Sequence, residues 1–188
     1  MKGAIVILIL FAIGAAVLFG NFVGVRNQIV TKNEVVRAAW AQVDVVLQRR
    51  ADLIPNLVET VKGYAKQEQT VIKSVADARA ALVGAHTPQD RIAANNQLDG
   101  ALGRLLVVVE NYPQLRSNEN FLRLQDELAG TENRIAIERR KYNEAVARYN
   151  TDIQLFPRNI VAGIFGYQID NAYFTTEPGA RTVPKVAF

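Results

Sequence analysis

RRADLIPNLVE, residues 49–59, is the most distinctive stretch of this sequence, and it lies inside an apolar heptad pattern. Across residues 29–82, apolar side chains recur at alternating steps of three and four, interrupted at Asn33, Arg50 and Glu68. This spacing places them on one stripe of a helix. The stripe consists of Ile29, Val36, Trp40, Val43, Leu47, Ile54, Leu57, Val61, Tyr64, Val71, Val75, Ala78 and Leu82. A stripe of this length predicts one long helix, or two helices placed end to end, covered by a partner along its length.

Pro55 is the obstacle to a single continuous helix. Inside a helix a proline removes a backbone hydrogen bond and clashes with the preceding turn, at a cost of about 3 kcal/mol. The helix therefore either kinks at Pro55, or ends nearby and restarts with Asp52 or a neighbouring residue as its cap. We expect a kink or a near-collinear break, because the apolar pattern passes Pro55 without a change of register.

Residues 3–25 form an apolar run in which Asn21 is the only strongly polar side chain. As a helix, about 23 residues span about 34 Å, which is enough to cross the hydrocarbon core of a bilayer once. A cleaved signal peptide is the alternative, with small residues among positions 12–16 near a cleavage point. The run continues well past the usual apolar region of a signal peptide, so the sequence predicts a retained transmembrane anchor at residues 1–25.

Two more helical segments follow residue 84. Thr87 can cap the first and Pro88 suits its opening position, while Ser117–Glu119 supplies caps for the second. The stripes of these segments are Leu98, Leu102, Leu105, Val109 and Tyr112, and then Phe121, Leu124, Leu128, Ile135, Tyr142, Val146, Tyr149, Ile153 and Phe156. Four segments with short connections predict an all-α fold, in which the N-terminal transmembrane helix precedes an elongated antiparallel four-helix bundle at residues 26–158.

Residues 159–174 form a short C-terminal apolar segment. Its apolar side chains include Ile160, Val161, Ile164, Phe165 and Tyr167. The segment is too brief to cross a membrane, so we expect it to pack against one end of the bundle. Contact with lipid or with another subunit is the alternative. Residues 175–188 are rich in Pro, Gly and Thr and are expected to form a flexible tail.

Composition argues against several classes of function. The net charge of +4 is too small and too evenly spread to indicate a nucleic-acid-binding face. The chain has no cysteine, and its only histidine, His86, lies in a polar turn, which is too little for a di-metal bundle site or for Ser/His/Asp catalysis. Solvated charges or ion pairs explain Asp52, Glu59, Glu127 and Glu132 better than a carboxylate metal site does. We therefore expect no catalytic residue, no cofactor and no metal.

Two charged residues, Arg50 and Glu68, occupy positions of the apolar stripe. A buried charge is costly unless it is paired. The simpler explanation is that these side chains reach solvent or pair within one bundle. The functional alternative is that they fix the register against a neighbouring subunit. The residues considered for such a register are Arg49, Arg50, Asp52, Asn56, Glu59 and Glu68.

The residues also carry a family resemblance. The block RRADLIPNLVETVKGYA at residues 49–65, preceded by Trp40, Gln42 and Asp44, resembles the signature of the LemA family of bacterial membrane proteins. Further matching positions are Asn120–Phe121, Leu124–Gln125, Glu127–Leu128, Thr131–Ile135, Arg140, Tyr142–Asn143, Tyr149–Asn150, Phe156–Pro157 and Val183–Val186 with Phe188. The resemblance covers nearly the whole chain. It implies a single-pass protein of the bacterial inner membrane with a four-helix soluble domain, and it implies no particular reaction.

The charges beside the apolar run bear on its orientation. Lys2 precedes the run, whereas Arg26, Lys32 and Arg37 follow it. By the positive-inside rule this distribution slightly favours a cytoplasmic body.

Two classes of function stay open. In the first, anchored copies associate side by side into a membrane-bound homo-oligomer that organises or curves the bilayer. In the second, a largely monomeric adaptor presents its helical faces to a membrane protease, sensor or envelope protein. The sequence favours the first class, because an adaptor is expected to carry one concentrated patch and none is evident. The expected partners are the lipid bilayer, further copies of the chain and other membrane proteins.

Overall fold

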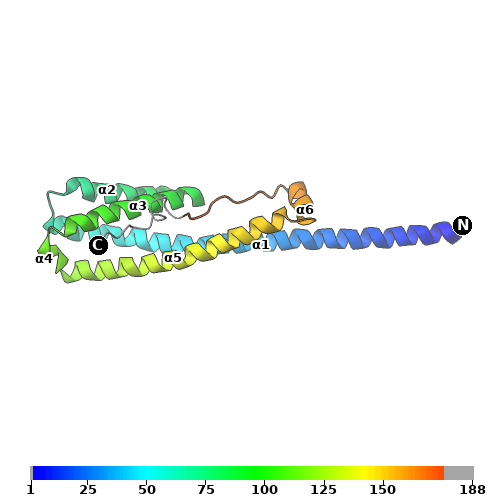
Figure 1. Cartoon of the computed structure of the whole chain (residues 1–188), viewed down its shortest axis with the longest axis horizontal. Helices are drawn as coiled ribbons and strands as arrows, with labels where there is room; N and C mark the ends of the chain where they lie inside the picture. The colour runs from blue at the N-terminus through cyan, green and yellow to red at the C-terminus, as the bar shows by residue number, and fades with distance from the viewer. Residues whose placement is uncertain (1, 176–188) are drawn as a thin grey trace, which may run out of the picture. The chain divides into compact units, whose positions relative to one another are not determined.

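The protein is all-helical, as the sequence predicts (Figure 1). The computed structural model describes residues 2–175, and no strand occurs within that range. The helices are α1 (Lys2–Tyr64), α2 (Gln69–Gly84), α3 (Pro88–Val109), α4 (Pro113–Arg116), α5 (Glu119–Gln154) and α6 (Arg158–Phe165). The predicted flexible tail, apart from Thr175, lies outside the described residues.

The chain divides into two compact units. Unit 1 contains the residues up to Ala39 together with Glu144–Asn171, and unit 2 contains Trp40–Asn143 together with the residues from Ala172 onward. Helices α1 and α5 each contribute residues to both units.

The apolar stripe is largely buried, but it does not lie on one helix or on two helices placed end to end. Helix α1 ends at Tyr64, which is exposed, and the chain reverses over residues 65–68 before α2 begins (Figure 1). In unit 2 this reversal buries both Val61 of α1 and Leu82 of α2 completely. The reversal removes the apolar face of α2 from water, which a straight continuation would not do. The connection contains neither Gly nor Pro, so the sequence carries no strong turn signal there.

Helix α1 continues through Pro55, so it does not end and restart there, and the predicted kink at that residue stays a prediction. Proline lacks an N–H group, which leaves the carbonyl oxygen of Ala51, four residues earlier, without its usual helical partner. The Nε atom of Arg79 in α2 donates a hydrogen bond to that oxygen at 3.1 Å. A side chain from a neighbouring helix therefore satisfies the acceptor that the proline leaves free.

Both predicted helix starts after residue 84 are confirmed. The backbone N–H of Asp90 donates to Oγ1 of Thr87 at 3.1 Å, ahead of α3. The backbone N–H of Phe121 donates to Oδ1 of Asn118 at 3.0 Å, ahead of α5. The predicted burial of Phe156 is wrong, because α5 ends at Gln154 and the Phe156 side chain is 79% exposed.

Candidate functional site

Arg50 forms a buried charge network inside unit 2. The residue belongs to α1 and is only 6% exposed. Its Nη1 atom lies 2.5 Å from Oδ1 of Asp99 in α3 and 2.9 Å from Oε2 of Glu132 in α5. The same nitrogen donates a hydrogen bond to Oδ1 of Asn95 in α3 at 3.1 Å. One arginine thus joins three helices, and two carboxylates compensate for the burial of its charge.

The pKa of the Asp99 carboxyl is raised above its ordinary value. Burial raises the pKa of Asp99 above its ordinary value of 3.8, Arg50 lowers it, and the negative charge of Glu132 raises it. The net direction is upward, so desolvation outweighs the attraction of Arg50. The Nδ2 group of Asn95 also donates to Oδ2 of Asp99 at 3.1 Å. The network is therefore a chain of polar groups that includes one carboxyl with raised proton affinity.

This geometry agrees with the simpler explanation of Arg50, which is pairing within one chain. The four other α1 residues considered for subunit register are Arg49, Asp52, Asn56 and Glu59, and they are exposed. Local partners occupy two of them: Nε2 of Gln48 donates to Oδ1 of Asp52 at 2.8 Å, and Lys62 pairs with Glu59 at 2.8 Å. A role of these residues in subunit register stays a prediction.

Glu68 is not part of the helical stripe. It lies in the connection before α2, where its Oε1 atom accepts a hydrogen bond from the hydroxyl of Tyr112 at 3.2 Å. The sequence pattern placed Glu68 on the stripe because the heptad spacing continues across the reversal. The residue instead links the connection to the segment that precedes α4.

The apolar C-terminal segment begins with α6, which packs within unit 1. Val161 is buried, whereas Ile160, Ile164 and Phe165 are exposed and Tyr167 is half-buried. Only one face of α6 is therefore buried within unit 1, and the packing of the segment against one end of the bundle stays a prediction. The candidate lipid or subunit contacts fall on both faces, since Val161 points into unit 1 and the exposed residues do not.

Asparagine side chains hold the backbone that follows α6. In unit 1, Nδ2 of Asn150 donates to the carbonyl oxygen of Asp170 at 2.7 Å, and the N–H of Asp170 donates to Oδ1 of Asn150 at 2.8 Å. The hydroxyl of Tyr149 donates to the carbonyl oxygen of Gln168 at 3.2 Å. The Asn150 amide pairs with one residue of extended backbone at two points, as a neighbouring strand would.

Asn143 forms the equivalent pair in unit 2. Its Nδ2 group donates to the carbonyl oxygen of Phe174 at 2.8 Å, and the N–H of Phe174 donates to Oδ1 of Asn143 at 3.0 Å. The Phe174 ring centroid lies 6.3 Å from that of Trp40 and 6.1 Å from that of Tyr142. Residue 174 is therefore fixed by its backbone and by an aromatic cluster.

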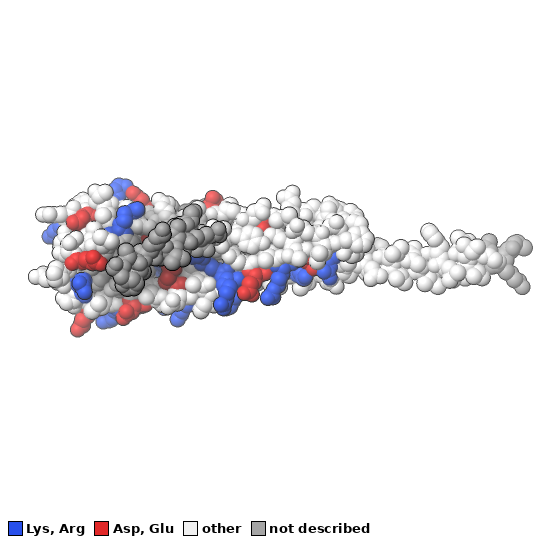
Figure 2. All heavy atoms as spheres, in the orientation of Figure 1, with Lys and Arg blue, Asp and Glu red and all other residues white. Residues whose placement is uncertain are grey.

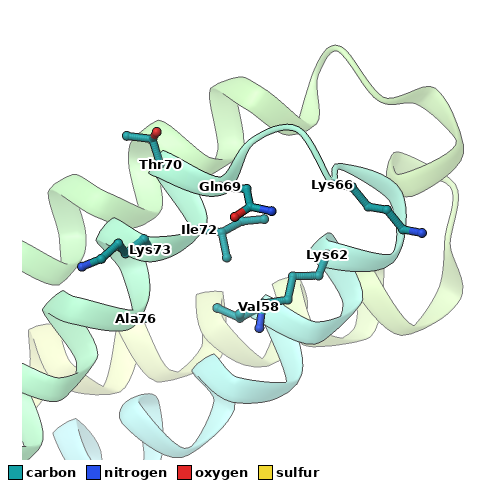
Figure 3. A pocket seen from close by; sticks show the side chains of 8 residues that line it. All are labelled: Val58, Lys62, Lys66, Gln69, Thr70, Ile72, Lys73 and Ala76. Carbon is teal, nitrogen blue, oxygen red and sulfur yellow. The ribbon is translucent and has the colours of Figure 1, made fainter.

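A hollow of about 700 Å³ lies where α1 meets α2 (Figure 3). It is lined by Val58, Lys62, Lys66, Gln69, Thr70, Ile72, Lys73 and Ala76. Figure 3 shows Gln69 and Ile72 near its middle, with Lys66 and Lys73 at opposite ends. Sequence reasoning missed this pocket because it did not predict the reversal at residues 65–68. The available signal was the recurrence of Val58, Lys62 and Lys66 at steps of four.

The start of α1 presents an apolar surface. One helix among residues 2–175, this one, is long and apolar enough to cross a membrane. Large side chains such as Phe11 and Leu18 are exposed, and Figure 2 shows no charged side chain along this stretch on the visible face. The one strongly polar side chain, Asn21, donates its Nδ2 hydrogen to the carbonyl oxygen of Val17 at 3.0 Å. Its donor is thus satisfied within the helix, as an apolar environment requires.

No metal centre is evident in the described part of the chain, which holds no group of three or more His, Asp or Glu residues arranged to bind an ion. His86 is exposed in the connection between α2 and α3. Glu127 is likewise exposed, and Glu132 is a partner of Arg50.

The sequence profile of the LemA family matches residues 39–188. The chain belongs to the LemA family. The matched region contains all of unit 2, and it includes Arg50, Asp99 and Glu132. The apolar start of α1 precedes the matched LemA region.

Relatives of this LemA-family chain carry two kinds of name. Magnetosome protein MamQ 2 of Paramagnetospirillum magneticum is 31% identical, and the match covers 83% of this chain and 66% of that protein. Magnetosome protein MamQ of Magnetospirillum gryphiswaldense is 29% identical, with 83% and 66% covered. Protein LemA of Metamycoplasma hominis is 21% identical, with 82% and 71% covered. The chain thus spans slightly less than two thirds of the length of its MamQ relatives.

Proposed function

We propose that this LemA-family protein is a single-pass protein of the bacterial inner membrane whose helical body self-associates into a structural, membrane-organising homo-oligomer. The observation that carries the proposal is the exposed apolar start of α1, which runs into the body as one uninterrupted helix. The proposal puts the body on the cytoplasmic side, because the basic residues after the run slightly favour that orientation.

The body in this proposal is an antiparallel four-helix bundle, formed by α2, α3 and the unit 2 parts of α1 and α5. Four contacts support it. Arg50 of α1 reaches α3 and α5, Arg79 of α2 reaches α1, and Nε of Arg91 in α3 lies 2.7 Å from Oδ1 of Asp44 in α1. Such a bundle offers long lateral faces to a second copy.

Self-association is supported by the apolar side chains that unit 2 leaves in water. These exposed residues are Val45, Val83, Leu106, Val107, Leu122 and Ile137. Burial against a second copy would remove this surface from water, at a gain of about 25 cal/mol for each Å² of apolar area. The similarity to proteins named magnetosome protein MamQ is compatible with a role at a membrane, and the proposal assigns the body no catalytic role.

The test is the mass and shape of the full-length protein in mild detergent, by light scattering and electron microscopy. We expect large regular particles. Val107→Glu places a charge on an exposed apolar position of α3 and should dissociate the particles into single chains. Gln97→Glu adds the same charge at another exposed position of α3 and should leave the particles intact. Single chains in the unmodified protein would refute self-association.

An adaptor is the second candidate function, and the hollow between α1 and α2 favours it. Its three lysines and apolar floor form the kind of concentrated patch that an adaptor needs. In that case the unmodified protein is a single chain in detergent. A Lys66→Glu variant would then keep its mass and lose its binding to the partner, such as a membrane protease, sensor or envelope protein.

A further inference from the structure

Helix α6 lies against the end of the apolar run in unit 1. The ring centroids of Phe165 and Phe22 are 5.8 Å apart, and the guanidinium carbon of Arg26 lies 5.0 Å from the centroid of Phe165. At the other end of α6, Nη2 of Arg158 donates to Oε1 of Gln28 at 2.7 Å. The helix therefore runs antiparallel to this part of α1, with its C-terminal end towards the apolar run.

These contacts show where α6 lies along the axis of the apolar run. Phe22 lies inside the apolar run, three residues before its end at Val25. At 1.5 Å per residue, this is about 4.5 Å within the run along the helix axis. If residues 3–25 cross the bilayer, then Phe165 lies at the level of the outermost acyl carbons on the side of the body.

The two faces of α6 differ in what covers them. Val161 and Ala162 are buried within unit 1. Ile160 and Ile164, one turn apart and therefore on one face, are 53% and 63% exposed. Phe156, just before α6, is also exposed. A helix that is apolar on its covered face and on its free face is unusual at a surface that faces only water.

The end of α6 is sharply defined. Gly166 adopts the left-handed conformation, with φ 71°, and the N–H of Tyr167 donates to the carbonyl oxygen of Ala162 at 2.9 Å. This is the arrangement of a Schellman motif, which reverses the chain after the last helical turn. An eight-residue helix spans about 12 Å, so α6 enters one leaflet at most before the chain turns away.

We propose that α6 is a second, shallow membrane contact, which places Ile160, Ile164 and Phe165 among the lipids of the leaflet next to the body. The proposal rests on the anchor assigned under Proposed function. Lipid is the occupant because the free face continues directly from the apolar surface of the anchor, through the contact of Phe165 with Phe22. Arg26, above the Phe165 ring, is suited to meet anionic headgroups while its stem remains near the apolar layer.

The test uses the absence of cysteine from the natural sequence, because a single introduced cysteine carries a unique label. Full-length Ile164→Cys, Val35→Cys and Leu10→Cys variants are labelled with an environment-sensitive fluorophore and reconstituted into vesicles of phosphatidylcholine and phosphatidylglycerol. Spin-labelled lipids then report contact by quenching. Val35 is the matched control, since it is also on the unit 1 surface and is 53% exposed. Ile160→Cys serves as a second probe of α6 in case the label disturbs residue 164.

We expect spin labels near the headgroups to quench the fluorophore at residues 160 and 164 at least about fivefold more than at residue 35. Spin labels deep in the bilayer should quench the fluorophore at residue 10. If residue 10 is quenched while residues 160 and 164 behave like residue 35, the anchor stands and the membrane contact of α6 is refuted. Blue-shifted emission at 164 without quenching would show that protein covers α6, and would also refute it. If the fluorophore at residue 10 is not quenched, the proposal of a transmembrane anchor is refuted, and the membrane contact of α6 is refuted with it.

Discussion

The Nε atom of Arg79 in α2 donates a hydrogen bond to the backbone carbonyl oxygen of Ala51 in α1, at 3.1 Å. Ala51 precedes Pro55 by four residues and is fully buried, so its carbonyl has neither a helical N–H partner nor access to water. An unsatisfied buried acceptor costs about 1–3 kcal/mol. This one contact explains how α1 accommodates a proline within the most distinctive stretch of the sequence.

We predict that the loss of stability caused by replacing Arg79 depends on whether residue 55 is a proline. Arg79→Met should lower the free energy of unfolding by about 1–2 kcal/mol, because it leaves the Ala51 carbonyl unsatisfied. With Pro55→Ala present, the new backbone N–H can restore the helical bond, so the same change should cost less than about 0.5 kcal/mol. Urea unfolding of the four proteins in this double-mutant cycle measures the difference. Equal costs in both backgrounds would contradict the explanation.

We predict that Arg50 stabilises the single chain. Arg50→Met should lower the free energy of unfolding by about 2–3 kcal/mol, because Asp99 and Glu132 would then lose the cation that contacts both of them. Arg49→Met changes the same residue type at the neighbouring exposed position and should cost less than about 0.5 kcal/mol. Chemical denaturation provides the comparison. Equal stabilities, with a loss of particle mass in Arg50→Met alone, would instead favour a register role between subunits.

We predict that Asp99 makes the protein more stable as the pH falls. Because its folded-state pKa is raised above 3.8, the folded state binds the proton more tightly than the unfolded state does. Its stabilising contribution is therefore full below the unfolded pKa and is lost as the pH rises through the folded pKa. The difference in unfolding free energy between the natural protein and Asp99→Asn should grow in favour of the natural protein as the pH is lowered towards about 4. If this difference in unfolding free energy instead shrinks as the pH falls, the effect of Arg50 on the pKa of Asp99 outweighs the effect of desolvation.

We predict opposite effects for two glycines near the end of α6. Gly166 has a φ of 71°, and Gly166→Ala should destabilise unit 1 by about 1 kcal/mol, because a side chain disfavours that conformation. Gly163 lies inside α6 with no atom within 4 Å of an added Cβ, so Gly163→Ala should be neutral or stabilising by up to about 1 kcal/mol. Thermal unfolding in detergent measures both. A loss of stability in both variants would show that space, and not backbone conformation, sets the requirement.

Prediction from the sequence succeeded where the cause is local. Thr87 and Asn118 cap their helices as expected, because a cap depends on a side chain and a backbone N–H only two or three residues away. The same reasoning misjudged Glu68, since a heptad pattern records spacing along the chain and not whether the helix is continuous. The partners of Arg50 lie 45 to 82 positions away in the sequence, and no local pattern identifies them.

The sequence alone predicts that this protein is helical, that most of the stripe is buried, and that the N-terminal run is long and apolar enough to cross a bilayer. Tyr64 is the exposed exception within the stripe. These properties follow from periodicity and composition, which act over a few turns of helix. Three further features are seen only in the folded chain: the reversal at residues 65–68, the hydrogen bond from Arg79 that compensates for Pro55, and the position of α6 beside the end of the apolar run. Each of these depends on contacts between residues distant in the sequence, whose free energies appear only when the helices pack.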